Sequence, residues 1–173
     1  MIEITTYHTQ EHRNSVLDFP VLAEGNQQWL GDGYYFWQDY EFAKWWGECK
    51  KCKKPINGKY YSIYTATLKF NQDDLIDTVF NETDYYNFVK KIEEFSKKFQ
   101  KKFHSKPSLE AFNDFIEDFG LWNEIKVVRF QDLPENNNLL EVNDYYYKKR
   151  IQIRVNDPGI ICKFVLHNNF LCI

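Results

Sequence analysis

Hydrophobic and polar residues alternate along several stretches of this chain, which predicts strands there. The first stretch opens the chain and predicts a short strand from Ile2 that ends near His8. A clearer one spans residues 60–70, where every second residue from Tyr64 to Phe70 is apolar and shares one face. Residues 150–155 alternate again, and the apolar runs at 125–130 and 160–167 are also typical of strands, so three more strands are expected late in the chain.

The middle of the chain changes to steps of three and four residues, which is the period of an amphipathic helix. Apolar residues recur in this way from Tyr85 to Phe103, with Lys and Glu between them, and predict a long helix. A second helix is expected from about Ser108 to Gly120, where glycine provides the stop.

Two further segments complete the pattern. Residues 10–30 carry Pro20, Gly25 and one brief apolar set, and predict a short helix and a loop. Residues 29–47 hold four of the five Trp and predict a loop, a strand and then a helix that Asp39 opens and Gly47 ends. The turn dipeptide Asn57-Gly58 and the run 134–138 are expected to lie outside regular elements.

The resulting order is strands, then helices, then strands, without the regular alternation of a parallel sheet. This order predicts an α+β fold with a mainly antiparallel sheet and a helical insertion. Since no linker or repeat interrupts the chain, residues 1–173 are expected to form a single domain, with a helical elaboration at about 81–120.

Composition narrows the class of protein. The 173 residues include 15 Phe, 12 Tyr and 5 Trp, enough bulk for a folded core and unlike a disordered chain. The formal net charge of -3 argues against a protein that coats nucleic acid. No stretch is long and apolar enough to span a membrane, and the start lacks signal-peptide features, so no membrane partner and a cytoplasmic location are expected.

The four cysteines leave two interpretations open. Cys49 and Cys52 form a C-x-x-C pair, which Cys162 and Cys172 would have to complete as a zinc site although their own spacing does not suit one. We therefore expect no metal and a solvated loop with free thiols at Cys49 and Cys52. Their neighbouring lysines also leave a minor redox role open.

The common phosphate-binding, zinc-protease and serine-hydrolase motifs are missing from the sequence. What remains is a histidine at the end of the first strand, a Gly-x-Gly-Tyr-Tyr-Phe element at 31–36, a helix carrying Ala43, Trp45 and Trp46, and Gln152 in a late strand. Taken singly, each residue has a structural interpretation: a core histidine, a turn, helix packing and a solvent-facing strand residue.

Taken in order, these residues resemble the bacterial PARP-like ADP-ribosyltransferases of the diphtheria-toxin type. In that family a Tyr-His-Gly-Thr strand precedes Gly-x-Gly-aromatic-Tyr-Phe, a helix with an alanine and an aromatic residue, and an acidic residue or Gln on a later strand. Tyr7-His8-Thr9, the segment from Trp29 to Trp46, and Gln152 occupy those places over residues 7–161. The resemblance implies an ADP-ribosyltransferase-like fold with a split sheet.

The resemblance also implies NAD as the substrate and a role for each residue. His8 would bond a ribose hydroxyl, the backbone of Thr9 would bind the nicotinamide amide, and Tyr35 would stack on the nicotinamide ring. Gln152 would bind the ribose 2′-hydroxyl. The remaining NAD-binding candidates close the other side of the ring or allow close approach of the backbone: Trp45 or Trp46, and Gly31 and Gly33.

Two departures from the family pattern affect the expected activity. Thr9 replaces the glycine that usually follows the histidine, so the backbone approach to nicotinamide requires Thr9 to be extended. Gln152 is uncharged where many members have Glu, so it can orient a hydroxyl but cannot stabilise a developing cation or act as a base.

The expected function is transfer of a single ADP-ribose from NAD to a macromolecular acceptor, as in a toxin or a phage-conflict protein with an antitoxin or immunity partner. NAD hydrolysis is compatible with the same residues. A catalytically silent module that binds NAD, ADP-ribose or nucleic acid is the alternative, and a protein-interaction domain is the third hypothesis.

Overall fold

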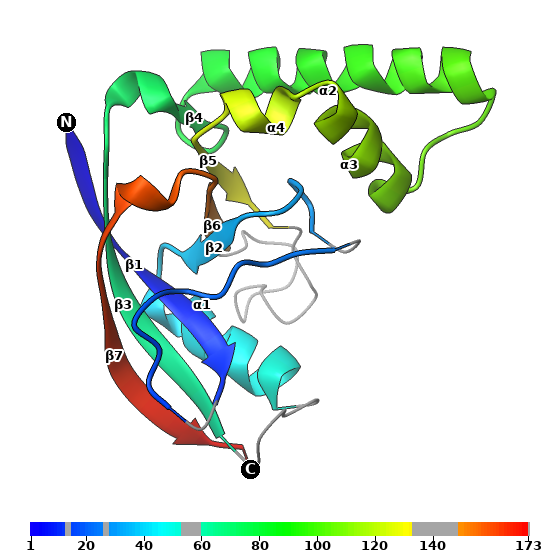
Figure 1. Cartoon of the computed structure of the whole chain (residues 1–173). Coiled ribbons are helices and arrows are strands. Elements are labelled where there is room, and N and C mark those ends of the chain that lie inside the picture. The colour runs from blue at the N-terminus through cyan, green and yellow to red at the C-terminus, as the bar shows by residue number, and fades with distance from the viewer. Residues whose placement is uncertain (13–14, 26–27, 53–59, 133–148, 173) are drawn as a thin grey trace, which may run out of the picture.

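The chain folds around one mixed sheet whose strands are almost all antiparallel. The computed structural model describes residues 1–12, 15–25, 28–52, 60–132 and 149–172 (Figure 1). In this part of the chain the strands follow the order β4-β5-β6-β2-β1-β3-β7, and only β4 and β5 pair in parallel. The strands are β1 (Ile2–Glu11), β2 (Tyr34–Trp37), β3 (Tyr60–Phe70), β4 (Leu75–Asp77), β5 (Val127–Gln131), β6 (Ile151–Val155) and β7 (Ile161–Leu171).

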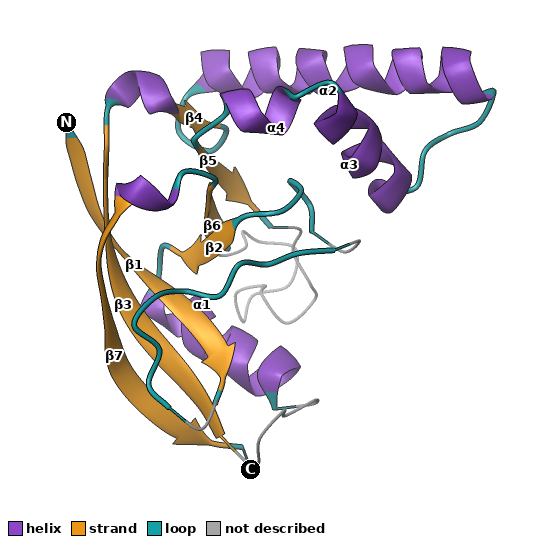
Figure 2. Cartoon of the chain, in the orientation of Figure 1, coloured by secondary structure: helices purple, strands orange, loops and turns teal. Residues whose placement is uncertain are grey.

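The sheet has two parts with a narrow connection. Figure 2 shows the long strands β1, β3 and β7 on one side and the shorter β2, β6 and β5 on the other. One register pair, Tyr7 with Trp37, joins β1 to β2, whereas β1 and β3 pair along ten residues. The predicted split is therefore not a break, because the two parts stay connected at this pair.

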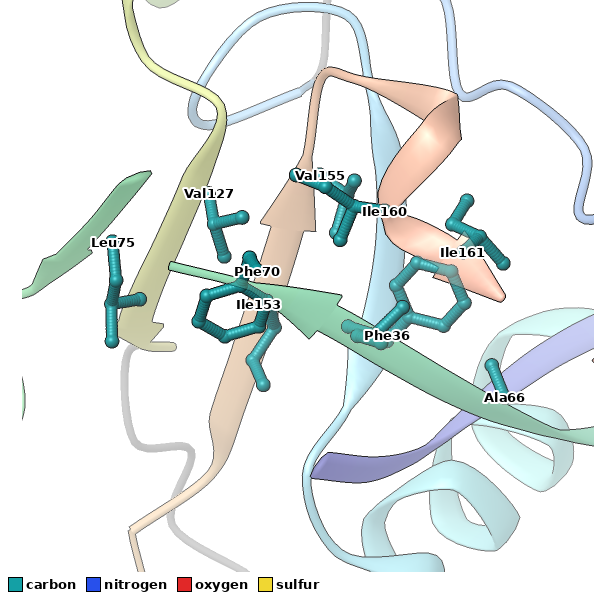
Figure 3. Close-up of a cluster of buried hydrophobic side chains, with 10 residues drawn as sticks. Phe36, Ala66, Phe70, Leu75, Val127, Ile153, Val155, Ile160 and Ile161 are labelled. Carbon is teal, nitrogen blue, oxygen red and sulfur yellow. The ribbon is translucent and has the colours of Figure 1, made fainter. Parts of the chain in front are cut away.

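A cluster of buried apolar side chains fills the space between the two parts of the sheet (Figure 3). Phe36, Ile153 and Val127 come from the shorter strands, and Ala66 and Phe70 come from β3. The alternation in β3 that predicts one shared apolar face is confirmed, since Ala66, Leu68 and Phe70 are all buried in this cluster. Burial of this inner face fixes the register of both parts, because a slip by one residue would turn the apolar side chains outward.

Helices pack against both parts of the sheet. They are α1 (Tyr40–Trp46), which continues into a π-helical turn (Gly47–Lys51), then α2 (Glu82–Phe103), α3 (Leu109–Asp118) and α4 (Leu121–Glu124). Helices α2 and α3 occupy the predicted helical stretch, and pack Phe95, Phe99 and Phe115 against Val128 and Phe130 of β5. The predicted caps are present: Ser108 accepts from Ala111 N–H, and Gly120 has a left-handed φ of 69°.

Several sequence-based boundaries were wrong. Strand β1 continues past His8 to Glu11, because β3 offers it pairing partners as far as Tyr61. The short helix expected within 10–30 is absent from the described residues of that range. Strand β4 was not predicted, and β7 runs beyond residue 167 to Leu171. The predicted turn at 57–58 and loop at 134–138 lie outside the described residues.

The cysteines correct a further expectation. Cys52 and Cys172 form a disulfide, with their Cα atoms 5.3 Å apart, so the prediction of free thiols was wrong for Cys52. Pairing of Tyr60 with Leu171 places the end of β7 beside the chain that enters β3, which explains how residues so distant in sequence meet. Cys49 and Cys162 are free.

No cluster of three or more His, Cys, Asp or Glu side chains among the described residues is arranged to hold a metal ion. None of the described helices is long and apolar enough to cross a membrane.

Candidate functional site

A pocket of about 620 Å³ lies where the end of β1 meets β2 and β6. We call it the central pocket. The lining comes from strands β1, β2, β5 and β6, from the end of α1 with its π-helical turn, and from residues 21–24, 28 and 29. The predicted site residues that line it are His8, Thr9, Tyr35, Trp46 and Gln152. The fold thus brings together residues as distant in the sequence as His8 and Gln152.

His8 lines this pocket, and its two ring nitrogens have different partners. Its Nδ1 lies 2.9 Å from the carbonyl oxygen of Tyr35. Since a carbonyl can only accept, Nδ1 must carry the proton and Nε2 must be the unprotonated acceptor. Nε2 is buried and has no partner with hydrogen-bond geometry among the described residues, although Gln10 lies near the ring. A buried acceptor in this position is suited to a hydroxyl or N–H of a ligand.

The surroundings of His8 keep its ring neutral. Burial lowers the pKa of His8 from 6.5 to about 4, and the hydrogen bond to Tyr35 offsets only part of this effect. Phe36 and Phe164 flank the ring at centroid distances of 5.8 and 5.9 Å. At neutral pH the imidazole is therefore a hydrogen-bond acceptor and not a cation.

Thr9 is extended, as the resemblance required. It pairs with Ile63 within the β1–β3 ladder, and its Oγ1 donates to the carbonyl of Ala43 at 2.7 Å. The side chain therefore holds α1 against the sheet. Thr9 stands where the family pattern has glycine, and the strand is regular at this position.

Tyr35 is held by its hydroxyl as well as by its ring. The hydroxyl donates to the Gly31 carbonyl at 2.6 Å and accepts from the Leu30 N–H at 3.3 Å. Burial raises the pKa of Tyr35 to about 12, so the phenol stays protonated and can donate. With its edge packed against Phe130, the ring is a fixed wall of the pocket.

The two glycines do not line the central pocket, so the structure gives no support to the prediction that they admit a ligand. Gly31 has a φ of 72°, which allows the turn that meets the Tyr35 hydroxyl. Gly33 lies against Arg154: a Cβ at this position would approach Arg154 Nε to 2.8 Å. The Arg154 guanidinium in turn donates to the carbonyl of Asp32, at 3.1 Å from Nε and 2.6 Å from Nη2. The Gly-x-Gly element therefore contributes to the packing around Tyr35: Gly31 binds its hydroxyl, and Gly33 leaves room for Arg154.

The two tryptophans of α1 have different positions. Trp46 lines the pocket, and Lys50 lies 5.7 Å from the centre of its ring. Trp45 does not line the pocket and packs edge-on against Trp37. The guanidinium of Arg150 lies 4.4 Å from the centre of the Trp45 ring, so Trp45 supports a pocket residue instead of facing the pocket.

Gln152 lies on the pocket face of the sheet. Its register partners are Trp37 on β2 and Phe130 on β5, and both of these also line the pocket. The alternate residues Ile153 and Val155 point to the apolar cluster on the other face. Strand β6 therefore separates a core face from a pocket face, and Gln152 belongs to the latter.

Sequence reasoning missed two ion pairs that line the same pocket. Arg150 Nη2 lies 3.2 Å from Asp132 Oδ2, and the side chains are 2% and 15% exposed. Lys51 Nζ lies 2.8 Å from Glu11 Oε2. Period-two alternation from Gln152 to Arg150 was a usable signal for one member. The partners become visible only when the sheet register is known.

Comparison of the chain with protein-family models, with curated proteins and with solved structures finds no match. The interpretation of the site therefore depends on its own geometry and on the motif resemblance.

Proposed function

We propose that this protein is a mono-ADP-ribosyltransferase that cleaves NAD in the central pocket and transfers ADP-ribose to a macromolecular acceptor. The observation that carries the proposal is the meeting of His8, Tyr35, Trp46 and Gln152 in one pocket, in the order and on the elements that the motif resemblance implies. The volume of about 620 Å³ lies within the range of small-molecule sites.

The neutral tautomer of His8, with the proton on Nδ1, supports recognition of a ribose. An unprotonated, buried Nε2 accepts a hydrogen bond from a sugar hydroxyl, and the Nδ1 bond to Tyr35 fixes the ring in that orientation. Gln152 adds an amide that can bond a second hydroxyl. A vicinal diol such as that of ribose offers two hydroxyls for these two groups.

The aromatic lining supports recognition of the nicotinamide. Tyr35 and Trp46 present rings to the pocket, and the hydroxyl bonds of Tyr35 prevent its ring from turning away. Lys50 places positive charge beside Trp46 in the same lining, which suits the negative charge of the NAD diphosphate, whereas the charge of Arg150 is already paired with Asp132.

The reaction then needs little covalent participation by the protein. The bond between nicotinamide nitrogen and ribose C1′ breaks, the leaving nicotinamide keeps the electron pair, and positive charge develops on the ribose as in glycoside cleavage. An acceptor nucleophile forms the new bond to C1′ and loses its proton to water. His8 and Gln152 hold the ribose, and the aromatic rings hold the nicotinamide. The bond between them is therefore fixed in position for attack by an acceptor that enters the pocket.

Labelled NAD tests the proposal directly. The purified protein is incubated with NAD carrying one label on nicotinamide and one on adenine, in a bacterial lysate, and both labels are followed. Release of nicotinamide with the adenine label on protein or nucleic acid is the expected result, and it also gives the acceptor class. Release without transfer would indicate an NAD hydrolase, and the absence of release would contradict an enzymatic function.

Gln152 specifically favours a second candidate, a catalytically silent module that binds NAD or ADP-ribose. It occupies the place where a Glu would contribute charge, and an amide contributes none. This candidate predicts that NAD raises the melting temperature without any release of nicotinamide. A nucleic-acid-binding version predicts the same stabilisation by an oligonucleotide.

A further inference from the structure

Cleavage of the nicotinamide–ribose bond creates positive charge beside Gln152, and an amide responds only weakly to it. Fixed negative charge stabilises such a transition state more strongly than a neutral dipole does. The pocket lining contains three carboxylates, Glu11, Glu24 and Asp132, and their positions differ in ways that matter for this role.

Asp132 directly follows β5, the strand that pairs with the strand of Gln152. Phe130 of β5 is the register partner of Gln152, and the Asp132 N–H donates to the Arg150 carbonyl at 2.9 Å, two residues further along the same two chains. All four side chains line the central pocket. Asp132 therefore extends the pocket face of the sheet by one position beyond Gln152.

The carboxylate of Asp132 is held in place. Arg150 pairs with it at 3.2 Å and is itself 2% exposed, with its guanidinium stacked on Trp45. Because the arginine is fixed by packing on one side and by the ion pair on the other, the carboxylate has a defined position and little exposure. Such preorganised charge is the kind that acts in catalysis without reorganisation.

The other two carboxylates suit the role less well. Glu11 is as buried as Asp132 and is likewise held by a cation, Lys51 at 2.8 Å, but it lies on β1, beyond the Tyr7–Trp37 pair and away from the strand of Gln152. Glu24 is exposed, so water weakens its field. Among the three, Asp132 is the carboxylate that the pairing of β5 with β6 places near Gln152.

We propose that Asp132 is a catalytic residue that supplies the negative charge that Gln152 lacks. This inference rests on the proposed function. As the bond from C1′ to nicotinamide breaks and nicotinamide leaves with the electron pair, the Asp132 carboxylate stabilises the cationic ribose. The acceptor then bonds to C1′ and its proton goes to water, so Asp132 is unchanged at the end of the cycle. Gln152 orients the hydroxyl and Asp132 provides the charge.

The test compares nicotinamide release by the wild type, Asp132→Asn and Glu93→Gln. Asp132→Asn keeps the shape of the side chain and removes its charge. It is expected to lower the rate of release about 100-fold while the Kd for NAD changes less than about threefold. Glu93→Gln is the control, because it removes an exposed carboxylate of α2 that does not line the pocket, and it is expected to keep the wild-type rate.

Asp132→Asn can also destabilise the fold, because the positive charge of Arg150 would stay buried without its carboxylate partner. The double variant Asp132→Asn, Arg150→Gln removes both charges and is expected to lose release to the same extent. Gln152→Glu, added to Asp132→Asn, returns a carboxylate to the pocket. We expect this double variant to release nicotinamide at least about ten times faster than Asp132→Asn alone. A merely structural role for Asp132 would not be rescued in this way.

Two outcomes distinguish a failure of the proposed role of Asp132 from a failure of the proposed function. If the wild type releases nicotinamide and a folded Asp132→Asn protein releases it within threefold of that rate, the role of Asp132 is overturned and the proposed function stands. If the wild type releases none, the proposed function is overturned, and the role of Asp132 is overturned with it.

Discussion

His8 is the residue whose chemistry is most sharply defined by its surroundings. The Tyr35 carbonyl fixes which nitrogen carries the proton, and burial keeps the ring neutral. A histidine in a strand has no sequence signal for either property, since both come from residues distant in the sequence, such as Tyr35 and Phe164. The sequence could propose His8 as a ribose ligand by resemblance, but only the structure assigns Nε2 as the acceptor.

Burial of His8 makes the free energy of unfolding depend on pH. The folded state takes up this proton near pH 4 and the unfolded state near 6.5, so between these values the unfolded state binds more protons. Stability should therefore fall by up to about 3 kcal/mol as the pH drops from about 6.5 to about 4. Urea unfolding of the wild type and of His8→Gln at several pH values measures this contribution.

The variant His8→Gln should lose most of that pH dependence, because glutamine does not titrate. His167 is exposed and provides the control, so His167→Gln should keep the wild-type slope. An unchanged slope in a folded His8→Gln protein would show that His8 is not the buried neutral group described here.

Gly33 illustrates how a motif residue can matter for a reason other than the expected one. The sequence suggested close approach of a ligand, whereas Arg154 and the Val155 carbonyl occupy the space beside its Cα. We predict that Gly33→Ala destabilises the fold by about 1–3 kcal/mol, because the new Cβ must displace the Arg154 side chain. Thermal unfolding measures the effect, with Gly159→Ala as a control, since the nearest atom there is a carboxylate oxygen at 3.2 Å on the Asp157 side chain. Equal stability of Gly33→Ala and wild type would contradict the packing argument.

Among the elements, those with strong periodicity could be predicted from sequence and those set by distant partners could not. Helix α2 buries one face over several turns, and β3 does the same from Tyr64 to Phe70, so their apolar residues repeat visibly. Strand β4 has three residues, too few for a pattern, and is created by pairing with β5. The last residues of β1 carry polar side chains, and they are extended because β3 continues beside them.

The π-helical turn connects the disulfide to the central pocket. Cys52 directly follows this turn, whose Lys50 and Lys51 line the pocket. We predict that loss of the disulfide lowers the free energy of unfolding by about 2–4 kcal/mol, since the bridge closes a long loop of the unfolded chain. It should also increase amide hydrogen exchange in the turn, which would lose one of its attachments.

Cys52→Ser and Cys172→Ser, compared by denaturant unfolding and by hydrogen exchange, provide the measurement. Cys162→Ser is the matched control, because Cys162 is a free and exposed thiol. A reducing agent should lower the melting temperature of the wild type and leave that of Cys52→Ser unchanged. If the wild type did not respond to reduction, the bridge would contribute nothing to the fold.

At the scale of the whole molecule, the two parts of the sheet create the site because they diverge beyond their one shared pair. Beyond the Tyr7–Trp37 pair, β1 continues with β3 while β2 pairs with β6, and the pocket lies where they separate. The order of motifs along the sequence could suggest this convergence. It could not reveal the Arg150–Asp132 pair, because these residues become neighbours only through the β5–β6 register.

The most direct test of the central claim is the rate at which the purified protein releases nicotinamide from NAD, measured for the wild type, His8→Ala and His167→Ala. We predict release by the wild type and by His167→Ala, and a rate about 10–100-fold lower for folded His8→Ala, because one buried hydrogen bond to the ribose is lost. Equal rates for His8→Ala and the wild type, or no release by any of the three, would contradict the account.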